Sequence, residues 1–277
     1  MTMLSLIGCI TRMRPTDLRR IVSHCPPCTW SEKEEHRYTG MRGVRLEFGP
    51  SRVQAVGTDG RVLVNVEADH NPVSRPQGDE KWDPVFDCCN VDMTALNKVK
   101  ASLGASSTVV TVTFNEHHAF FTWANNRGKK SEKAFAAKCP LIIGRFPKWE
   151  TVIAPMDRYE CLTVIEAGDW TERWKGYTAA PATGYRIGFG GSEANQGRMR
   201  ICLTRVEDML FLPVKRSDGG DRSMVNPVCL NLEFVMDFLR RCSGPVEIRT
   251  GGPHDPVRMD IPHVSLTIMP IATGDDR

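Results

Sequence analysis

The sequence predicts an α+β protein whose sheets are mostly antiparallel. Segments in which β-branched and apolar residues dominate, or alternate with period two, are more numerous than helical segments. The links between many of these strands are too short for the crossover that parallel pairing requires. Each of four short helices follows one strand and precedes several others, so the order strand, helix, strands recurs four times along the 277 residues.

The predicted strands are short and are separated by polar, turn-forming residues. The two segments that flank residues 115–117 form a predicted hairpin. The Pro-, Asp- and Asn-rich residues 70–81 and the basic residues 125–130 predict loops. The strands are expected at residues 4–10, 43–48, 52–56, 61–68, 108–114 and 118–123.

Each predicted helix begins at a residue whose side chain can accept a hydrogen bond from the first turn. The four candidates are Thr16 or Asp17, Asp92, Asp169 and Asn231. Apolar residues at helical spacing follow each one and predict its buried face. They are Leu18, Ile21, Val22 and Cys25; Leu96, Val99 and Leu103; Trp170, Trp174 and Tyr177; and Val235, Phe238 and Leu239.

The four repeats predict two domains. They begin near Leu4, Phe86, Tyr159 and Val228, and two repeats together have the length of an ordinary domain. Pro155 closes the segment that joins the second repeat to the third, so we place the domains at residues 1–154 and 155–277.

Composition is that of an ordinary globular protein, with 41% hydrophobic and 25% charged residues and a net charge of +3. No apolar run approaches the length that spans a bilayer, so no membrane association is expected. The first residues, MTMLSLIGCITRMRPTD, lack the basic start and cleavage site of a signal peptide, so we expect a cytoplasmic protein.

The ten cysteines do not form a recognisable metal-binding frame. Cys25 and Cys28 make one CxxC pair, but no second pair follows at the spacing of a zinc site, and we expect neither metal nor cofactor. The interpretation that fits most of them is a buried, reduced thiol. This applies to the cysteines inside strand-like segments, namely Cys9, Cys139, Cys161, Cys202 and Cys229. A redox or metal role for the CxxC pair stays open.

Positive charge recurs on the predicted helices. A single basic pair is ordinarily a solvated helix face, but the pattern repeats on all four helices. Such a repeated pattern would suit a surface that follows the phosphates of duplex DNA without reading its bases. The residues concerned are Arg19, Arg20, Lys98, Lys100, Arg173, Lys175, Arg240 and Arg241.

Several short segments, in order and at fitting distances, resemble the bacterial β sliding clamps, the β subunit of DNA polymerase III. The first pair resembles the family's middle domain, and the others resemble the connection to the last domain, its main helix and its final strands. The segments are GVRLEF at 43–48, VGTDGRVL at 56–63, FPKWETVI at 146–153, LNLEFVMDFL at 230–239, PVRM at 256–259 and IMPI at 268–271.

The resemblance implies a clamp fold, with sheets outside and helices lining a ring around duplex DNA. Family chains have three domains and their rings have six, so a chain that resembles the last two domains is expected to form a homotrimer. The family binds DNA polymerase and the clamp loader through short apolar peptides. Such a protein is a processivity factor for DNA replication and has no catalytic activity of its own.

The family's peptide groove is also implied for matching positions of this chain. The alternative is that these residues only form a core and tight turns. Arg61 and Val62 replace the family's usual His and Arg, and His254 replaces an aliphatic residue, so partner preference is left open. The groove residues would be Met41, Thr58, Gly60, Leu63, Pro147, Val152, Asn231, Phe234, Met269, Pro270 and Ile271.

Two other functions are alternatives to a DNA-encircling clamp. An enzyme is disfavoured because the sequence contains no P-loop, GxSxG or HExxH motif, and the Gly-rich residues 188–191 do not open a helix. A clamp-like decoy or regulator, which binds clamp partners without closing into a ring, stays open.

Overall fold

A computed structural model provides the structure of the chain. It describes residues 10–25, 29, 38–49, 51–74, 88–104, 107, 109–125, 133–175, 185–188, 198–203, 209–213, 216–218, 228–252 and 254–271. The chain divides into two compact units, residues 1–147 (unit 1) and 148–277 (unit 2). This division precedes the boundary expected after Ala154, and the turn η4 (Trp149–Thr151), with its buried Trp149, lies between the two positions.

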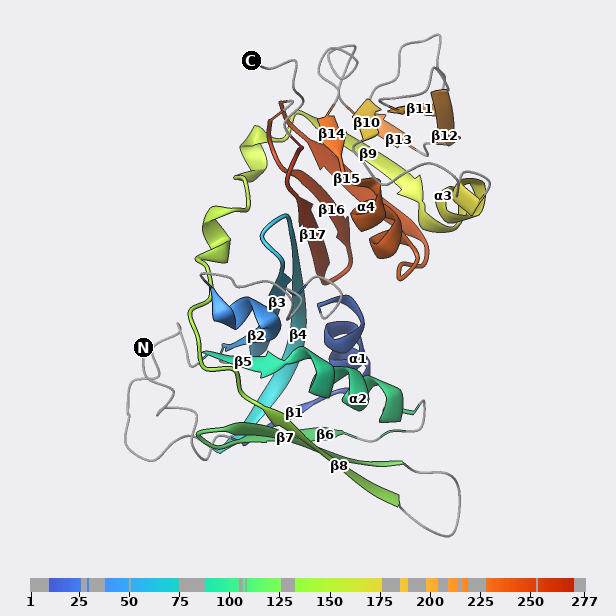
Figure 1. The fold of residues 1–277 in the computed structure, drawn as a ribbon. Coiled ribbons are helices and arrows are strands. Elements are labelled where there is room, and N and C mark those ends of the chain that lie inside the picture. Colours follow the sequence, from blue (N-terminus) through green and yellow to red (C-terminus); the bar gives the residue numbers. More distant parts are fainter. Residues whose placement is uncertain are drawn as a thin grey trace. The chain divides into compact units, whose positions relative to one another are not determined.

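Unit 1 contains two successive rounds of one strand, one helix and three strands (Figure 1). The first round is β1 (Ile10–Met13), α1 (Pro15–His24), the turn η3 (Thr39–Arg42), β2 (Gly43–Phe48), β3 (Arg52–Thr58) and β4 (Val62–Ser74). The second round is β5 (Cys88–Asp92), α2 (Met93–Ser102), β6 (Val110–Phe114), β7 (His118–Asn125) and β8 (Lys133–Pro140).

The two rounds of unit 1 exchange their first strands. β1 pairs with β6 of the second round, while β5 pairs with β2 of the first, and all these pairs are antiparallel. Hairpins β2–β3–β4 and β6–β7–β8 complete the sheets. The long strand β4 connects the β2–β3–β4 hairpins to the strands around β1, because its first part pairs with β3 and its last part pairs with β1. Neither round can therefore complete its sheets alone.

Unit 2 repeats this topology. It contains η4, the turn η5 (Met156–Arg158), β9 (Cys161–Glu166), α3 (Ala167–Trp174), β10 (Tyr185–Gly188), β11 (Arg198–Leu203), β12 (Met209–Pro213), β13 (Arg216–Asp218), β14 (Val228–Leu230), α4 (Leu232–Leu239), β15 (Pro245–Thr250), β16 (Val257–Ile261) and β17 (Val264–Ile268). β9 pairs with β15 of the later round, and β14 pairs with β10 of the earlier one. The predicted fourfold recurrence and antiparallel pairing are confirmed.

Two helix starts are confirmed and two are wrong. The side chains of Asp92 and Asn231 accept hydrogen bonds from Ala95 N (2.8 Å) and Glu233 N (2.9 Å). Helix α1 instead begins at Pro15, a residue whose fixed φ and missing N–H suit the first turn. Helix α3 begins directly after β9, which leaves Asp169 exposed within its first turn.

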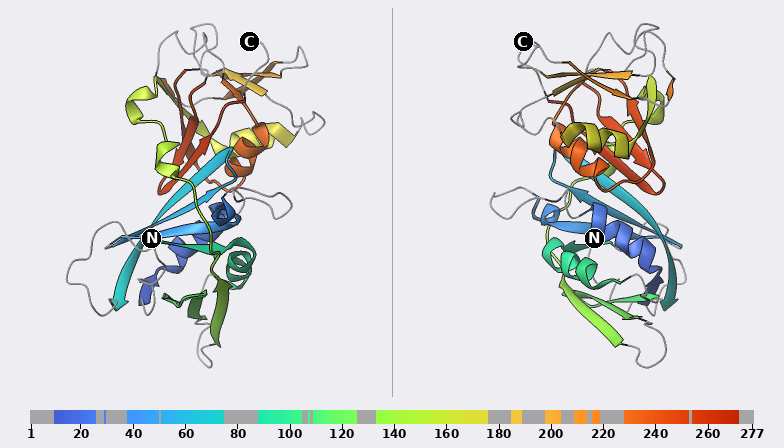
Figure 2. Two further views of the ribbon diagram at one scale, coloured as in Figure 1. Left: turned by 60° about the vertical axis from the view of Figure 1, so that its left-hand side comes forward. Right: turned by 90° about the vertical axis from the view of Figure 1, so that its right-hand side faces the viewer.

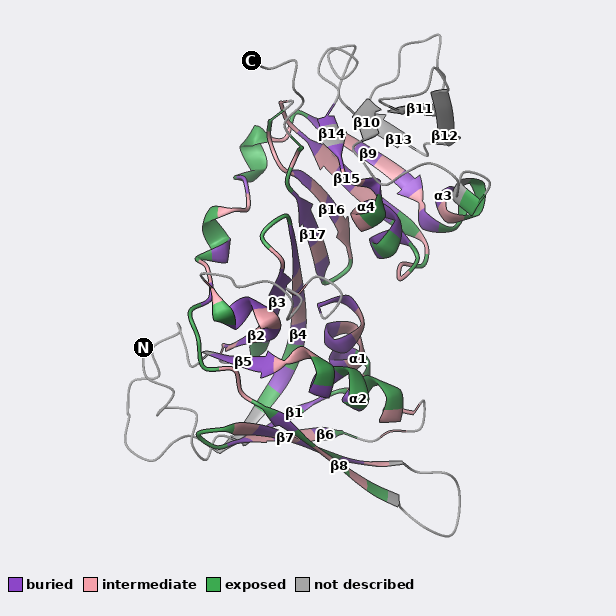
Figure 3. Cartoon of the chain, viewed as in Figure 1, coloured by how far each residue is buried: buried purple, intermediate pink, exposed green. Residues whose placement is uncertain are grey.

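The helices of each unit pack as a pair. Helix α1 packs against α2 and β4, and α2 also packs against β5 and β8; α3 packs against α4, β9 and β12 (Figure 2). Strand side chains alternate between buried and more exposed positions, and the helices cover part of the buried side (Figure 3). All the apolar residues predicted to face inward on α1, α2 and α4 are buried, as is Trp170 of α3. The predicted Trp174 and Tyr177 positions lie outside the described side chains.

The predicted positions of most strands are correct, but some of their boundaries are wrong. The hairpin of β6 and β7 is confirmed, and Asn115 closes it by accepting hydrogen bonds from His117 N and His118 N. The predicted loop at 70–81 is wrong in its first part, because β4 continues to Ser74 through its pairing with β1. The first strand is predicted at residues 4–10. The structure has β1 at Ile10–Met13, and residues 4–9 lie outside the described part.

Cys25, Cys89, Cys139 and Cys161 are buried in the core, whereas Cys242 is half-buried. Cys139 is fully buried, and burial raises the pKa of its thiol to about 12. Cys25 is also buried, with Sγ 3.3 Å from the carbonyl oxygen of Ala55, whereas Cys28 lies outside the described residues. Within the described ranges, no three His, Cys, Asp or Glu side chains are grouped to hold a metal ion. No helix in that same part of the chain is long and apolar enough to cross a membrane.

Candidate DNA-facing and partner-binding surfaces

The two candidate DNA-facing arginines of helix α1 form hydrogen bonds with other elements of unit 1. The guanidinium of Arg19 donates to the carbonyl oxygen of Gly104, just beyond the end of α2. Arg20 donates to Asp17 Oδ1 (3.1 Å) and to the carbonyl oxygen of Glu67 (3.4 Å). Both arginines are half-buried. They therefore already have acceptors that join α1 to α2 and β4.

Helix α2 presents two lysines to solvent. Lys98 and Lys100 are exposed, while Leu96 and Val99 of the same helix are buried. The side of the helix that carries the ammonium groups is thus open, because its apolar residues face the core. Among the described residues, neither ammonium group is in an ion pair, so both are available to an approaching phosphate.

In unit 2 the candidate cations are partly neutralised. Lys175 Nζ lies 2.6 Å from Glu172, and Arg240 Nη1 lies 3.1 Å from Asp237. These are exposed pairs three residues apart, which contribute little stability and exchange readily. Arg173 is exposed and Arg241 is half-buried.

The predicted DNA-facing residues therefore fall into two groups. The exposed group consists of Lys98, Lys100, Arg173, Lys175 and Arg240. Its members are long, flexible cations on helices, an arrangement that can neutralise phosphates but does not fix a base-reading geometry. Arg19, Arg20 and Arg241 form a half-buried group with less freedom to reach a ligand.

The unit 1 part of the predicted partner groove centres on a tight turn. The Thr58 hydroxyl donates to Val62 O (2.7 Å) and accepts from Gly60 N (3.1 Å), so it is used within the turn. Asp59 Oδ1 accepts from Arg61 N and Val62 N. Gly60 has a φ of 89°, which a residue with a side chain adopts only at a cost. The turn therefore presents a bare backbone at Gly60.

Two further unit 1 groove positions, Met41 and Leu63, lie at or near this turn. The Met41 methyl group lies 3.6 Å from where a Cβ at Gly60 would stand, so these two predicted residues are neighbours. Met41 and Leu63 are buried, and Pro147 is half-exposed. Within unit 1, Gly60 is thus the groove position that is most open to solvent.

The unit 2 groove positions are more open. Met269 and Ile271 follow β17 as large apolar side chains with exposed fractions of 38% and 40%. Their three-residue stretch also includes half-exposed Pro270. Asn231 is engaged as the cap of α4, and Phe234 in the first turn of that helix is half-exposed, as is Val152.

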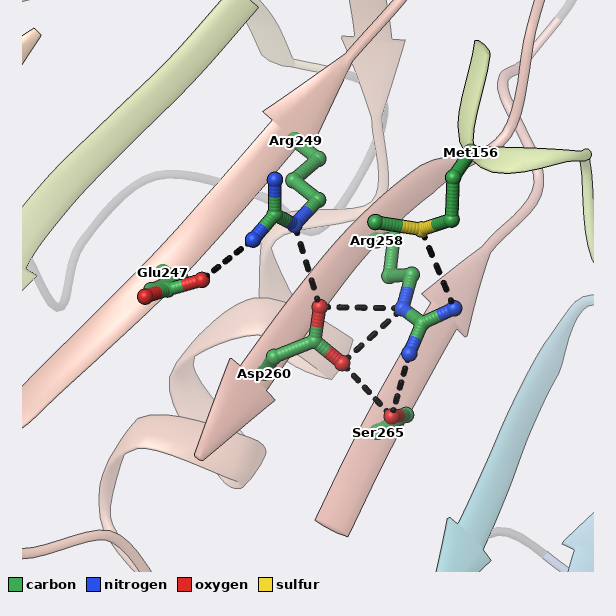
Figure 4. A network of polar contacts seen from close by, with 6 residues as sticks. All are labelled: Met156, Glu247, Arg249, Arg258, Asp260 and Ser265. Atoms are coloured by element: carbon green, nitrogen blue, oxygen red, sulfur yellow. Dashed lines mark hydrogen bonds and ion pairs between the residues drawn. The ribbon is translucent and has the colours of Figure 1, made fainter. Parts of the chain in front are cut away.

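A polar network on β15, β16 and β17 was not predicted from the sequence (Figure 4). Arg258 Nε lies 2.9 Å from both carboxylate oxygens of Asp260, and its Nη2 donates to Ser265 Oγ (3.0 Å). Arg249 bridges Glu247 (2.5 Å) and Asp260 (3.6 Å). The available signal was the alternation of opposite charges with period two in 247–249 and 258–260.

The phenol of Tyr159 lies near this network. Its pKa is raised mainly because the ring is partly buried, with smaller effects from Arg258 and Asp260. The charges of Arg249, Arg258, Glu247 and Asp260 balance one another, so the network is a rigid, nearly neutral surface.

Comparisons with known proteins place this geometry among DNA clamps. No protein-family profile and no curated protein matches the sequence. Solved structures do match. A sliding clamp from Bacillus subtilis has a TM-score of 0.74 and 13% identity, over 96% of this chain and 65% of that chain. The Pseudomonas aeruginosa clamp bound to griselimycin has a TM-score of 0.73 and 17% identity, over 95% of this chain and 65% of that chain. The DNA polymerase III β subunit of Thermotoga maritima has a TM-score of 0.72 and 14% identity, over 97% of this chain and 66% of that chain.

The chain spans about two thirds of the length of these clamps. The similarity covers both units with few identical residues, so it concerns the fold. This chain therefore has the fold of the bacterial DNA sliding clamps, the β subunit of DNA polymerase III.

Proposed function

We propose that this protein is a DNA sliding clamp, a non-enzymatic processivity factor that encircles duplex DNA in the cytoplasm and tethers a polymerase. The observation that carries the proposal is the match to sliding clamps over nearly the whole chain. Exposed cations on helices support it, because they suit contact with phosphates of any sequence. Contacts of this kind hold DNA loosely, which permits sliding.

We further propose that the ring is a homotrimer. Six domains close a ring in the family that the sequence resembles, so three copies of a two-unit chain would supply them. β8 supports the idea, because among the named strands it is hydrogen-bonded to β7 alone. Its residues 134–137 are small or aromatic and uncharged, and an edge strand of this type can pair with another chain.

Partner proteins would dock through short apolar peptides at residues 269–271. The exposed side chains of Met269 and Ile271 support this, because each would lose contact with water when a peptide covers it. Methionine adapts its shape to different partners, which suits a surface shared by a polymerase and a clamp loader.

The test is retention on DNA of different topology. The protein would be loaded onto nicked circular DNA at low salt, then washed at about 0.5 M NaCl before and after the circle is cut once, a salt level at which simple phosphate contacts are largely lost. A clamp stays on the circle and is released by the cut. Equal retention on circular and cut DNA would contradict encirclement. Light scattering on the same preparation gives the number of copies.

A second candidate is a regulator that binds clamp partners without encircling DNA. The structure offers one reason to consider it, since Arg19 and Arg20 are engaged within unit 1 and Lys175 and Arg240 are paired with acids. A monomer that binds a polymerase peptide but never stays on circular DNA would favour this function over the ring.

A further inference from the structure

Met156 is a large apolar side chain that unit 2 leaves open to solvent. Its exposed fraction is 51%. Figure 4 shows it reaching from η5 toward Arg258 on β16, with its Sδ atom 3.6 Å from Arg258 Nη1. A residue of this type on a monomer surface commonly marks an interaction site when it stands beside other exposed apolar residues.

The backbone that carries Met156 is held in place. Arg158 N donates to Pro155 O (3.0 Å) and Tyr159 N donates to Met156 O (3.3 Å), which closes the turn. Glu160 N then donates to Thr250 O (2.9 Å) and fixes the turn to the end of β15. The exposure of Met156 is therefore a property of an ordered surface.

Arg258 is positioned in the same way. Asp260 and Ser265 engage its Nε and Nη2 atoms, which fixes the plane of the guanidinium. Its Nη1 atom faces the thioether of Met156, which is a weak acceptor. A stronger acceptor, such as a peptide carbonyl oxygen, would gain a hydrogen bond there without disturbing the other contacts.

Met269 follows the strand that pairs with the strand of Arg258. In the β16–β17 pairing, Arg258 stands opposite Thr267, so their side chains share a face. Met269 is two residues beyond Thr267 and directly follows Ile268, the last residue of β17. Met156 contacts Arg258, so both methionines lie near the end of β17 at which Arg258 pairs with Thr267.

We propose that Met156 and Arg258 form an additional docking point for an extended apolar peptide that also contacts residues 269–271. An apolar side chain of the peptide packs on Met156, and a main-chain carbonyl oxygen accepts from Arg258 Nη1. The balanced charges around Arg258 favour this neutral occupant over nucleic acid or a free anion. The proposal rests on the proposed function, because it extends the site for the same class of partner.

The direct test is NMR of the protein with ¹³C-labelled methionine methyl groups, titrated with a clamp-binding peptide from a polymerase of the same host. Met156→Leu and Met269→Leu variants assign the two signals. Both signals should shift with one common Kd. A shift of Met269 with none at Met156 overturns this docking point and leaves the proposed function intact. No shift at either methionine would contradict both.

Affinity supplies an independent measurement. Met156→Ala should weaken the peptide about three- to tenfold, the loss expected when a half-exposed side chain no longer becomes buried. Ile143→Ala is the matched control, because Ile143 is a 74% exposed apolar residue of unit 1 outside the proposed site. Equal affinities of the Met156→Ala and Ile143→Ala variants would overturn the inference.

Discussion

The guanidinium of Arg19 donates a hydrogen bond to the carbonyl oxygen of Gly104, which is 85 residues away in the sequence. Gly104 follows the end of α2, where backbone carbonyls lack partners within the helix and a nearby cation is favourable. The contact joins the two helices of unit 1. It gives this arginine a structural role that is separate from any DNA contact.

Replacing Arg19 should therefore affect stability more than DNA binding. We expect Arg19→Ala to lower the free energy of unfolding by about 1 kcal/mol, because one hydrogen bond to a charged donor is lost at a partly exposed site. Urea unfolding monitored by circular dichroism measures this change. A variant with unchanged stability and reduced DNA retention would show instead that Arg19 faces DNA.

Replacing the α2 lysines should have the opposite effect. Lys98→Ala with Lys100→Ala removes two exposed cations from each chain. The slope of the logarithm of DNA affinity against the logarithm of salt should become less steep by about two for each chain that contacts DNA. Fluorescence anisotropy with a labelled duplex, at several salt concentrations, measures it. Arg19→Ala is the control, and identical slopes for the two variants would contradict this assignment.

The residues after β17 should control partner binding. Met269→Ala with Ile271→Ala should cost roughly 2–4 kcal/mol of peptide binding, or about 30-fold or more in affinity. Anisotropy with a labelled polymerase peptide measures the loss, and light scattering checks that assembly is unchanged. Full affinity in a correctly assembled double variant would place the partner site elsewhere.

His70 should make stability depend on pH. Its Nε2 lies 2.6 Å from the Gly49 carbonyl oxygen and must donate, so Nδ1 accepts from the Thr11 hydroxyl at 2.7 Å in the neutral ring. Burial is the main reason that the pKa of His70 lies below its ordinary value of 6.5, although Asp69 acts in the opposite direction.

The folded chain therefore takes up a proton at His70 less readily than the unfolded chain. Stability should fall as pH decreases through 6.5 toward the lowered pKa, and it should be unaffected by this group well above 6.5. Urea unfolding at pH 7.5 and 5.5 measures the change in the natural protein and in His70→Gln. If both lose the same stability at low pH, His70 is not the group responsible.

The two kinds of helix start should respond differently to substitution. Asn231→Ala removes the hydrogen bond from Glu233 N and should cost about 1 kcal/mol of stability. Asp169→Asn should cost only a few tenths of a kcal/mol, because Asp169 is exposed within the first turn of α3 and caps nothing. Thermal unfolding of the two variants compares them. Equal losses would contradict the cap assignment.

Local chemistry made part of this molecule predictable from the sequence. Asp92, Asn231 and Asn115 bond to backbone groups only two or three residues away, so their roles can be recognised from short patterns. The apolar periodicity of the helices likewise identified their buried faces, and the recurring order of elements predicted the α+β repeat. The predicted partner groove rests on resemblance, and the predicted DNA surface rests on the basic residues that recur on the four helices; both stay predictions.

Only the tertiary structure decided which polar groups meet. Arg19 finds Gly104, Thr11 finds His70, and β4 is extended by pairing with β1, all through contacts between distant segments. A basic residue on a helix has the same local pattern whether it contacts a phosphate or a carbonyl oxygen of its own chain. Which of the two it contacts depends on the residues that pack beside it. That packing follows from long-range contacts, which form when the two rounds of each unit exchange their first strands, and a short sequence pattern does not contain them.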